Sequence, residues 1–131
     1  MPTPKFISLS FVLKIHQRQI KQFGGTLGLR DEGLLESALA QPQASFAGQL
    51  LHPTIAEQAS AYLYHLAKNH PFIDGNKRTA LATMDTFLRI NGHSLALTNT
   101  QVYELVINVA QGKMSKSELA EFLESVICKS Q

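Results

Sequence analysis

The middle of the chain carries two consecutive amphipathic helical patterns with only a short connection between them. Thr54-Ile55-Ala56-Glu57 has the spacing of a capping box, which predicts a helix over residues 55–69. A second pattern over residues 76–91 is closed by Asn91-Gly92, as a C-terminal glycine closes a helix. Each pattern has one apolar face, made of Ile55, Ala59, Tyr62, Leu63, Leu66 and Ala67 in the first and Ala80, Met84, Phe87 and Leu88 in the second. We expect these two helices to pack together at the centre of the fold.

The rest of the chain is also mainly helical by its apolar spacing and end signals. Ser10 can cap a helix over residues 11–23, and Asp31 can cap another over residues 32–40. Helices are also predicted over residues 100–110 and 116–128, and only residues 5–9 and 93–97 look extended. The sequence therefore predicts a compact, single-domain all-α fold over residues 1–131, with about six helices and at most a short β-ribbon.

The composition narrows the classes of protein to consider. A chain of 131 residues can bury roughly 68% of its unfolded surface in one domain. It has no apolar run near 18 residues, and residues 1–5 do not read as a signal, so we expect a cytoplasmic protein without membrane association. Cys128 is the only cysteine, which excludes an internal disulfide and a Cys-based metal site. A net charge of +2 without a basic face argues against nucleic acid as a partner.

The connection between the central helices, Asn69-His70-Pro71-Phe72-Ile73-Asp74-Gly75-Asn76-Lys77-Arg78, is unusual for a simple turn. Pro71 disfavours helical geometry at His70, so the first helix should end there and leave the imidazole at the rim of the junction. Phe72 can anchor the loop in the core, and Gly75 permits a backbone conformation that other residues resist. We expect a loop of fixed shape here.

Two cations open the second central helix. Lys77 and Arg78 lie in its first turn, where each opposes the helix dipole by about 0.3–1 kcal/mol. Asp74 or Asn76 can cap this helix, and its first N–H groups follow the permissive Gly75. Free N–H groups, a glycine and two cations together predict a site for phosphate.

Each of these residues also has a plainer structural explanation. His70 could merely end a helix, Asp74 could merely cap the next one, and the two cations could be solvated. Their combination in one loop favours a functional site. The other histidines show no metal-ligand spacing, and we interpret all of them as structural: His16, His52, His65 and His93. The run Gly75–Arg78 is not a Walker A loop, because no Gly directly precedes the Lys and no Ser or Thr directly follows it.

The nine residues His70–Arg78 resemble the signature of the Fic/Doc superfamily, and the Lys77 variant looks like the Doc branch, named for the death-on-curing toxin. The resemblance extends to Gln22-Phe23-Gly24-Gly25, Leu29-Arg30-Asp31-Glu32-Gly33, Asn76-Lys77-Arg78-Thr79-Ala80-Leu81 and Phe87-Leu88-Arg89-Ile90-Asn91-Gly92. It implies a compact α-helical Fic fold and the transfer of a phosphate-containing group from a nucleotide to a protein hydroxyl.

Two positions depart from the pattern of Fic adenylyltransferases, which carry Gly in place of Lys77 and a second Arg in place of Leu81. The resemblance to the Doc branch instead implies a toxin that acts as a kinase, binds ATP in the opposite orientation and phosphorylates a threonine of elongation factor Tu, which stops translation. Two alternatives stay open: an adenylyl or other nucleotidyl transferase that acts on a protein hydroxyl, and a non-catalytic module that binds a partner or nucleic acid.

The chemistry of the motif suggests a role for each residue. His70 can act as the general base that takes the proton of the attacking hydroxyl. Asp74 is the only carboxylate of the motif, and carboxylate and phosphate oxygens together suit Mg²⁺. The phosphates of ATP would be bound by backbone donors and positive charges from Gly75, Asn76, Lys77 and Arg78.

The resemblance also implies two kinds of partner contact. Residues 45–53 would form a flap that holds the target peptide by backbone pairing. Fic proteins are often silenced by a helix with Ser or Thr, three further residues, Glu, and then Gly or Asn, which Ser117–Phe122 nearly matches. Because a capping box at Ser115–Glu118 already explains this segment, we do not expect self-inhibition. We expect a separate antitoxin that is partly disordered and folds onto the protein as a helix.

Overall fold

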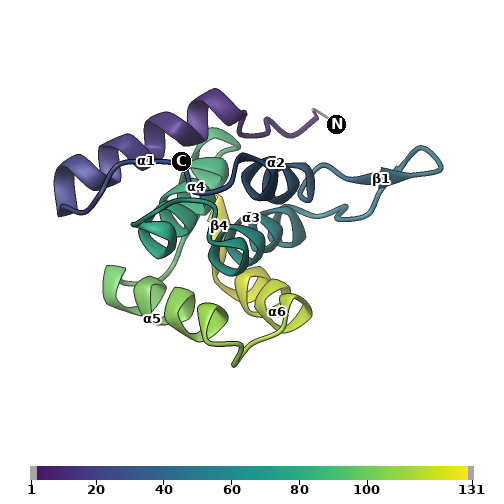
Figure 1. Cartoon of the computed structure of the whole chain (residues 1–131). Coiled ribbons are helices and arrows are strands. Elements are labelled where there is room, and N and C mark those ends of the chain that lie inside the picture. Colours follow the sequence, from purple (N-terminus) through teal and green to yellow (C-terminus); the bar gives the residue numbers. More distant parts are fainter. Residues whose placement is uncertain (1–2, 130–131) are drawn as a thin grey trace.

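The computed structural model describes residues 3–129, and in these residues the chain forms six helices and two short antiparallel ribbons (Figure 1). The predicted all-α fold is confirmed. Residues 1–2 and 130–131 of the predicted domain lie outside the described residues. The first two of these belong to the segment 1–5, which we do not expect to be a signal. The elements are α1 (Leu9–Phe23), α2 (Glu32–Ala40), β1 (Ser45–Phe46), β2 (Gln49–Leu50), α3 (Ile55–Asn69), α4 (Asn76–Ile90), β3 (His93–Leu95), α5 (Asn99–Ala110), α6 (Lys116–Val126) and β4 (Ile127–Lys129).

Side-chain caps explain where most of the helices begin. In the described residues, five of the six helices start at an oxygen that accepts a hydrogen bond from a backbone N–H of the first turn, supplied by Ser8, Asp31, Thr54, Thr98 and Ser115. The predicted cap at Ser10 is wrong, because the Ser8 hydroxyl accepts from the Phe11 N–H and α1 begins at Leu9. The capping box at Ser115 is confirmed, with Glu118 as the reciprocal acceptor. At Thr54 the box is not reciprocal, since its hydroxyl donates to the Glu57 carboxylate instead.

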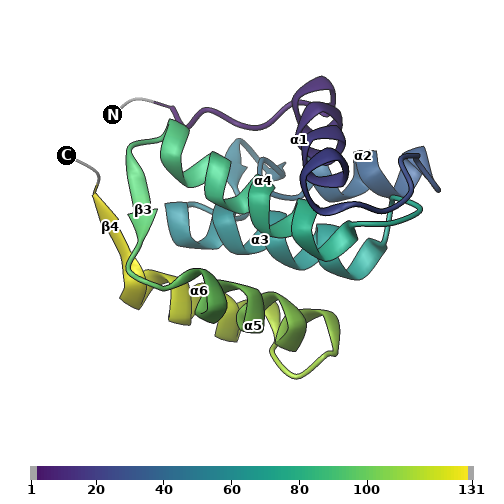
Figure 2. The same ribbon diagram turned by 90° about the vertical axis from the view of Figure 1, so that its left-hand side faces the viewer.

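Helix α3 lies at the centre of the molecule, with α2, α4, α5 and α6 packed around it (Figures 1 and 2). Its predicted apolar face is buried except for the half-buried Ile55, and the predicted inward face of α4 is fully buried. The α1 helix crosses α4 on the outside (Figure 2). The segment before α1 is anchored to the core, because the Ile7 N–H donates to the Tyr62 hydroxyl at 2.7 Å. On α6, Leu119 and Leu123 are buried, whereas Phe122 is 36% exposed.

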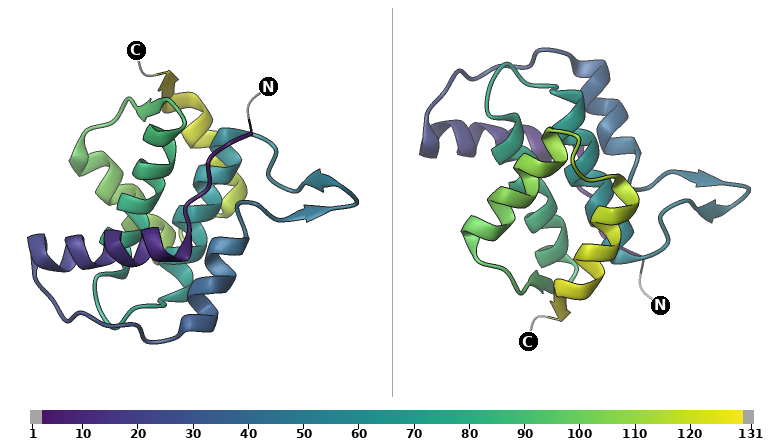
Figure 3. Two further views of the ribbon diagram at one scale, coloured as in Figure 1. Left: turned by 90° about the horizontal axis from the view of Figure 1, so that it is seen from above. Right: turned by 90° about the horizontal axis from the view of Figure 1, so that it is seen from below.

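The first ribbon, β1–β2, is a hairpin that projects from the helical body (Figure 3). Ser45 pairs with Leu50 and Phe46 with Gln49, around a turn in which Ala47 and Gly48 both have positive φ. All four strand residues are exposed. The hairpin therefore lies within the predicted flap at residues 45–53.

The second ribbon, β3–β4, corrects the predicted end of the last helix. That helix was expected to run to Cys128, but it ends at Val126 because residues 127–129 pair with residues 93–95. Extended structure was expected at 93–97 and is present at 93–95, whereas residues 5–8 lead into α1 without forming a strand. None of the helices in residues 3–129 has the length and apolar character needed to cross a membrane.

Candidate active site

The loop between α3 and α4 begins with an unusual backbone conformation at His70. His70 is the C-cap of α3 and has φ 49° and ψ 54°, in the left-handed region. Residues other than Gly adopt this conformation uncommonly, although Asn, Asp and His do so more often than the rest, and it costs of order 1–3 kcal/mol when the surroundings impose it. The His70 side chain is exposed, as the rim position predicted from Pro71 requires. Other contacts must therefore hold the turn in place.

Residues 28–31, just before α2, supply the first set of these contacts. The backbone N–H groups of Arg30 and Asp31 both donate to the Pro71 carbonyl, at 2.8 and 3.0 Å. Two residues further on, the Ile73 N–H donates to the carbonyl of Gly28 at 3.0 Å. A short stretch of backbone far away in the sequence thus pairs with the loop.

The side chain of Arg30 completes this attachment. Its guanidinium donates to the His70 carbonyl at 2.7 Å and to the Asn69 carbonyl at 2.9 Å. Carbonyls at the C-terminal end of a helix have no partners within the helix, and a cationic donor there also favours the helix dipole. Arg30 lies in a segment that resembles the Fic/Doc pattern, but no local signal assigned it this role.

Two side chains tie the middle of the loop to the core. Phe72 is buried, as expected for an anchor. The amide of Asn76 accepts from the Phe72 N–H and donates to the Phe72 carbonyl, both at 2.9 Å. Asn76 therefore does not cap α4 with its side chain. The donor that remains for a ligand is its backbone N–H.

The His16 side chain packs against the loop, and this contact was not predicted from the sequence. The ring is 2% exposed and stacks on Phe72, with centroids 3.8 Å apart and an angle of 8° between the planes. Its Nε2 lies 2.9 Å from the Asp74 carbonyl. A carbonyl only accepts hydrogen bonds, so Nε2 must carry the proton. His16 is structural, as interpreted, but the structure it holds is the candidate active-site loop.

Asp74 has an exposed carboxylate whose two oxygens are oriented by the backbone. Oδ2 accepts from the Thr26 N–H at 3.1 Å, and Oδ1 accepts from the Gly75 N–H at 2.9 Å. A Cβ on Gly25 would lie 2.7 Å from Oδ2, so this close approach requires a glycine. Asp74 is not the N-cap of α4, because Gly75 occupies that position with φ 73° and ψ 21°.

The start of α4 differs from every other helix start in residues 3–129. It alone has no side-chain cap, and like α1 and α5 it has no acidic residue in its first turn. Lys77 and Arg78 follow, and neither has a carboxylate within 4 Å, since the only ion pair in the described part of the chain joins Arg89 to Asp85. Both the unpaired N–H groups and the unpaired cations favour an anion at this position.

These features meet in one cleft of about 520 Å³, a volume typical of small-molecule sites. Phe23, Gly24 and Gly25 border it on the α1 side, and Tyr103 borders it on the α5 side. All the residues predicted to form the site line this cleft, namely His70, Asp74, Gly75, Asn76, Lys77 and Arg78. The structure thus brings the predicted residues together, while the roles suggested for them stay predictions.

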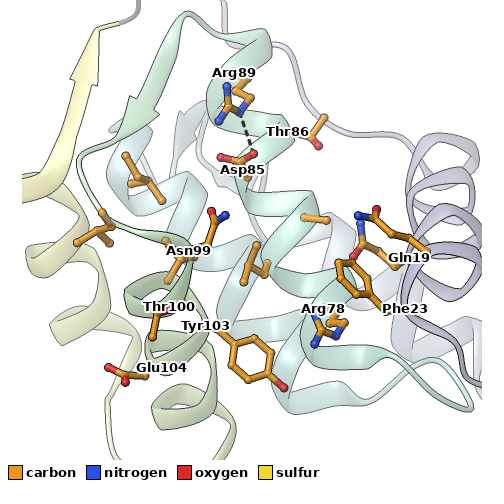
Figure 4. Close-up of a pocket in the computed structure, with 16 residues that line it drawn as sticks. Gln19, Phe23, Arg78, Asp85, Thr86, Arg89, Asn99, Thr100, Tyr103 and Glu104 are labelled. Atoms are coloured by element: carbon orange, nitrogen blue, oxygen red, sulfur yellow. Dashed lines mark hydrogen bonds and ion pairs between the residues drawn. The ribbon is translucent and has the colours of Figure 1, made fainter.

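A second, larger groove of about 880 Å³ begins beside this cleft and runs between α1, α4 and α5 (Figure 4). Phe23, Arg78 and Tyr103 line both hollows and form the wall between them. Apolar residues of the groove are Leu81, Ala82, Leu95, Leu97 and Val102, and polar residues include Gln19, Asp85, Arg89, Asn99 and Glu104. Leu81, where adenylylating Fic proteins have a second Arg, thus belongs to the groove.

Two other histidines lie away from the cleft. His65 Nε2 is 3.2 Å from the Lys116 Nζ, which joins α3 to the first residue of α6. Burial, followed by the charges of Lys116 and His52, lowers the pKa of His65 to about 4. Burial, followed by the Lys116 charge, also lowers the pKa of His52. Both histidines are therefore neutral at neutral pH.

Comparison with known proteins identifies the family of this chain. The model of the Fic/DOC family matches residues 6–88, which is more than half of the chain. The chain therefore belongs to the Fic/DOC family, as its motif indicated.

Two relatives are similar to the chain beyond the motif. It is 32% identical to the protein kinase doc of Escherichia phage P1 over 119 residues, which cover 91% of this chain and 93% of that protein. It is 53% identical to the toxin Doc of Mycolicibacterium smegmatis (strain ATCC 700084 / mc(2)155) over 74 residues, or 56% of this chain. The second match spans 57% of that relative's length.

Proposed function

We propose that this protein is the toxin of a toxin–antitoxin pair and a protein kinase that transfers the γ-phosphate of ATP to a threonine hydroxyl of elongation factor Tu. The observation that supports it most is the uncapped start of α4, where Lys77 and Arg78 have no carboxylate partner among residues 3–129 and lie beside the exposed His70. The names of the two relatives, a toxin and a protein kinase, favour the same function.

Phosphate binding follows from the geometry of the loop. The first N–H groups of α4 and the helix dipole attract an anion, and two cations in the same turn add charge that no carboxylate of the described chain pairs with. Phosphoryl transfer depends mainly on positioning and on stabilising charge that spreads over the phosphoryl oxygens. The fixed loop would position the phosphates, and its N–H groups and two cations would stabilise their charge.

Asp74 suits Mg²⁺ bound together with the phosphates. The carboxylate is fixed by two N–H groups and still has lone pairs open to the cleft. In the described residues, no three His, Cys, Asp or Glu side chains gather into a metal site. One carboxylate with phosphate oxygens and waters is a usual way to hold Mg²⁺, so the donor set fits this ion. When bound, the ion neutralises charge on the phosphate oxygens.

His70 is placed to act on the attacking hydroxyl. In the proposed step the threonine oxygen forms a bond to the γ-phosphorus while its proton passes to the His70 imidazole. The bond between the γ-phosphorus and the bridging oxygen breaks, and ADP leaves. The Arg30 guanidinium donates to the His70 carbonyl, and the N–H groups of Arg30 and Asp31 donate to the Pro71 carbonyl. These contacts keep the imidazole at the mouth of the cleft.

The position of the hairpin sets how far a target must extend to reach both the hairpin and His70. The hairpin leads into the first turn of α3, whereas His70 follows its last turn. These ends are separated by a helix of 15 residues, or about 22 Å. A target that pairs with the exposed strands and also reaches His70 must span this length.

The groove between α1, α4 and α5 is the site that we assign to the antitoxin. Its apolar floor and polar rim match the two faces of an amphipathic helix. Arg78 forms part of its wall, so a helix bound there would lie against the phosphate cleft. This arrangement lets one bound segment both stabilise and silence the protein.

Labelled ATP tests the function and separates the alternatives. The protein and its His70→Ala variant are incubated with purified elongation factor Tu, and with cell extract, in the presence of ATP labelled at the γ- or the α-phosphate. We expect γ-label on elongation factor Tu with the parent, no α-label, and loss of the γ-label by at least about 100-fold with the folded variant, as is typical when a general base is removed. The α-label alone would indicate nucleotidyl transfer, and the absence of both would indicate a binding module.

A further inference from the structure

We propose that Phe23 and Tyr103 are positioning residues that hold the guanidinium of Arg78 between their rings and direct it toward phosphate in the cleft. This inference rests on the proposed function, because it assumes that the cleft binds phosphate. Neither aromatic residue belongs to the loop motif. One ends α1 and the other lies in α5, on opposite sides of the start of α4.

The distances define an aromatic clamp, by which we mean Phe23, Arg78 and Tyr103. The guanidinium carbon of Arg78 lies 4.0 Å from the centroid of the Phe23 ring and 5.1 Å from that of the Tyr103 ring. Both values are within the range of about 6 Å in which a cation is attracted to an aromatic face. Figure 4 shows Arg78 between the two rings, at the boundary of the groove.

Hydrophobic burial does not explain why these rings are there. Phe23 is 50% exposed and Tyr103 is 36% exposed, and neither belongs to the buried core. Phe23 is also the last residue of its helix and is followed by Gly24. Contact with the cation is the specific interaction that the two rings share.

An aromatic clamp suits an arginine that must bind phosphate. A carboxylate partner would neutralise the guanidinium and occupy its N–H donors, as Asp85 does for Arg89 on the same helix at 2.8 Å. An aromatic face restrains the cation without accepting those in-plane donors, which can then bind two phosphate oxygens. Arg78 has no carboxylate within 4 Å in the part of the chain that the structure describes.

The first test measures binding rather than transfer. Calorimetry with inorganic tripolyphosphate is applied to Phe23→Leu, Tyr103→Leu and the double variant, with Phe23→Tyr and Tyr103→Phe as controls that keep a ring. Each Leu variant should bind about two- to fivefold more weakly, and the double variant about tenfold more weakly. The ring-keeping controls should bind like the parent. In an Arg78→Ala background, the same Leu substitutions should change binding by less than about 1.5-fold, since their effect acts through Arg78.

The second test observes the clamp itself in the unliganded protein. Proton–nitrogen NMR should show the Arg78 Nε–H shifted upfield by the ring currents of its neighbours, and the shift should shrink in each Leu variant but not in the controls. An Arg78 resonance at the position of a free arginine side chain would overturn the proposal. This measurement needs only the parent protein, so it does not depend on the folding of a variant.

The outcomes separate this inference from the proposed function. If the parent binds tripolyphosphate and the Leu variants bind equally well, or weaken just as much without Arg78, the clamp is wrong and the kinase proposal is unaffected. If binding depends on the rings as expected but no label is ever transferred, the kinase proposal fails and the clamp stands. A parent protein that does not bind tripolyphosphate would overturn the clamp, whatever the transfer assay shows.

Discussion

The carboxylate of Asp74 illustrates how single residues in this site combine structural and chemical roles. Backbone N–H groups of Thr26 and Gly75 hold its two oxygens, and Gly25 leaves room for the first of these contacts. Each oxygen keeps a second lone pair that these contacts do not use. Fixing the carboxylate before a ligand arrives removes the entropy cost of ordering it during binding.

Replacing Asp74 by Asn should separate these two roles. Asn has one acceptor oxygen, so the Asp74→Asn variant keeps one of the two backbone hydrogen bonds and loses about 1 kcal/mol of unfolding free energy. Transfer should decrease and should need more Mg²⁺, because a neutral amide is a poorer ligand than a carboxylate. Denaturant unfolding and a Mg²⁺ titration of label transfer measure the two effects.

Asp31→Asn is the matched control for this experiment. Asp31 accepts from the Leu34 N–H at the start of α2, and Asn caps a helix about as well as Asp. This variant should keep the parental Mg²⁺ titration. If Asp74→Asn also keeps it, with an unchanged rate, Asp74 only shapes the loop.

Local sequence was sufficient to find the loop residues but not the residues that hold them. His70 and Asp74 belong to a contiguous motif, so their chemistry could be read without the fold. Arg30 acts on the His70 carbonyl from 40 positions away, and His16 acts on the Asp74 carbonyl from 58 positions away. Contacts of this kind depend on tertiary packing and have no local pattern.

The uncapped start of α4 is a property of the element rather than of one residue. A side-chain cap typically contributes about 0.5–2 kcal/mol, and α4 forgoes it while also carrying two cations in its first turn. Burial of Ala80, Met84, Phe87 and Leu88 against the rest of the core stabilises the helix instead. Helix α4 is therefore stable even though its first turn has no side-chain cap and carries two cations.

The contact between α3 and α6 predicts a dependence of stability on pH. Burial, Lys116 and His52 lower the pKa of His65 from 6.5 to about 4 in the folded protein. As the pH falls, the unfolded chain takes up this proton first, so the stabilisation is present above pH 6.5 and is lost between pH 6.5 and about 4. The His65→Gln variant keeps an acceptor for Lys116 but does not titrate.

Thermal unfolding between pH 7 and pH 4 measures this effect. The midpoint of the parent should fall steeply over that range, and the midpoint of His65→Gln should fall less. His52, whose pKa is also lowered, should account for part of the remaining slope. Parallel curves for the two proteins would show that His65 is not the titrating group.

The presence of each helix was easier to predict from the sequence than the residues at which it begins and ends. Apolar spacing and caps indicated all six helices, and the ranges predicted for α2 and α3 agree with the structure. The end of α6 was wrong because residues 127–129 pair with a strand that lies more than thirty residues earlier in the chain. The apolar spacing favoured continuation of the helix, and this tertiary pairing ended it earlier.

At the scale of the whole molecule, the helices place three features around α3. His70 lies at one end of it and the exposed hairpin at the other, while the groove between α1, α4 and α5 opens beside the phosphate cleft. Phe46, near the tip of the hairpin, is 76% exposed. In the proposed function, this separation lets the protein engage its target and its antitoxin by different faces.

In the proposed function, Lys77 determines which phosphate of ATP is transferred. Fic adenylyltransferases have Gly at this position, and the proposed kinase has a cation that contacts the transferred phosphate. The Lys77→Gly variant should unfold at nearly the parental free energy, because removing the unfavourable charge gains about 0.3–1 kcal/mol and helical Gly costs about 1 kcal/mol. A change in transfer would then reflect the site and not the fold.

The decisive measurement is the incorporation of γ-label and α-label from ATP into elongation factor Tu by the parent and Lys77→Gly proteins at matched concentration. We predict γ-label with the parent and a loss of roughly 10²–10³-fold with the variant, the usual effect of removing one charged contact to a transition state. Because Leu81 stands where adenylylating relatives have a second Arg, we expect at most a small gain of α-label. Undiminished γ-transfer by Lys77→Gly, or α-label with the parent, would contradict the proposed kinase.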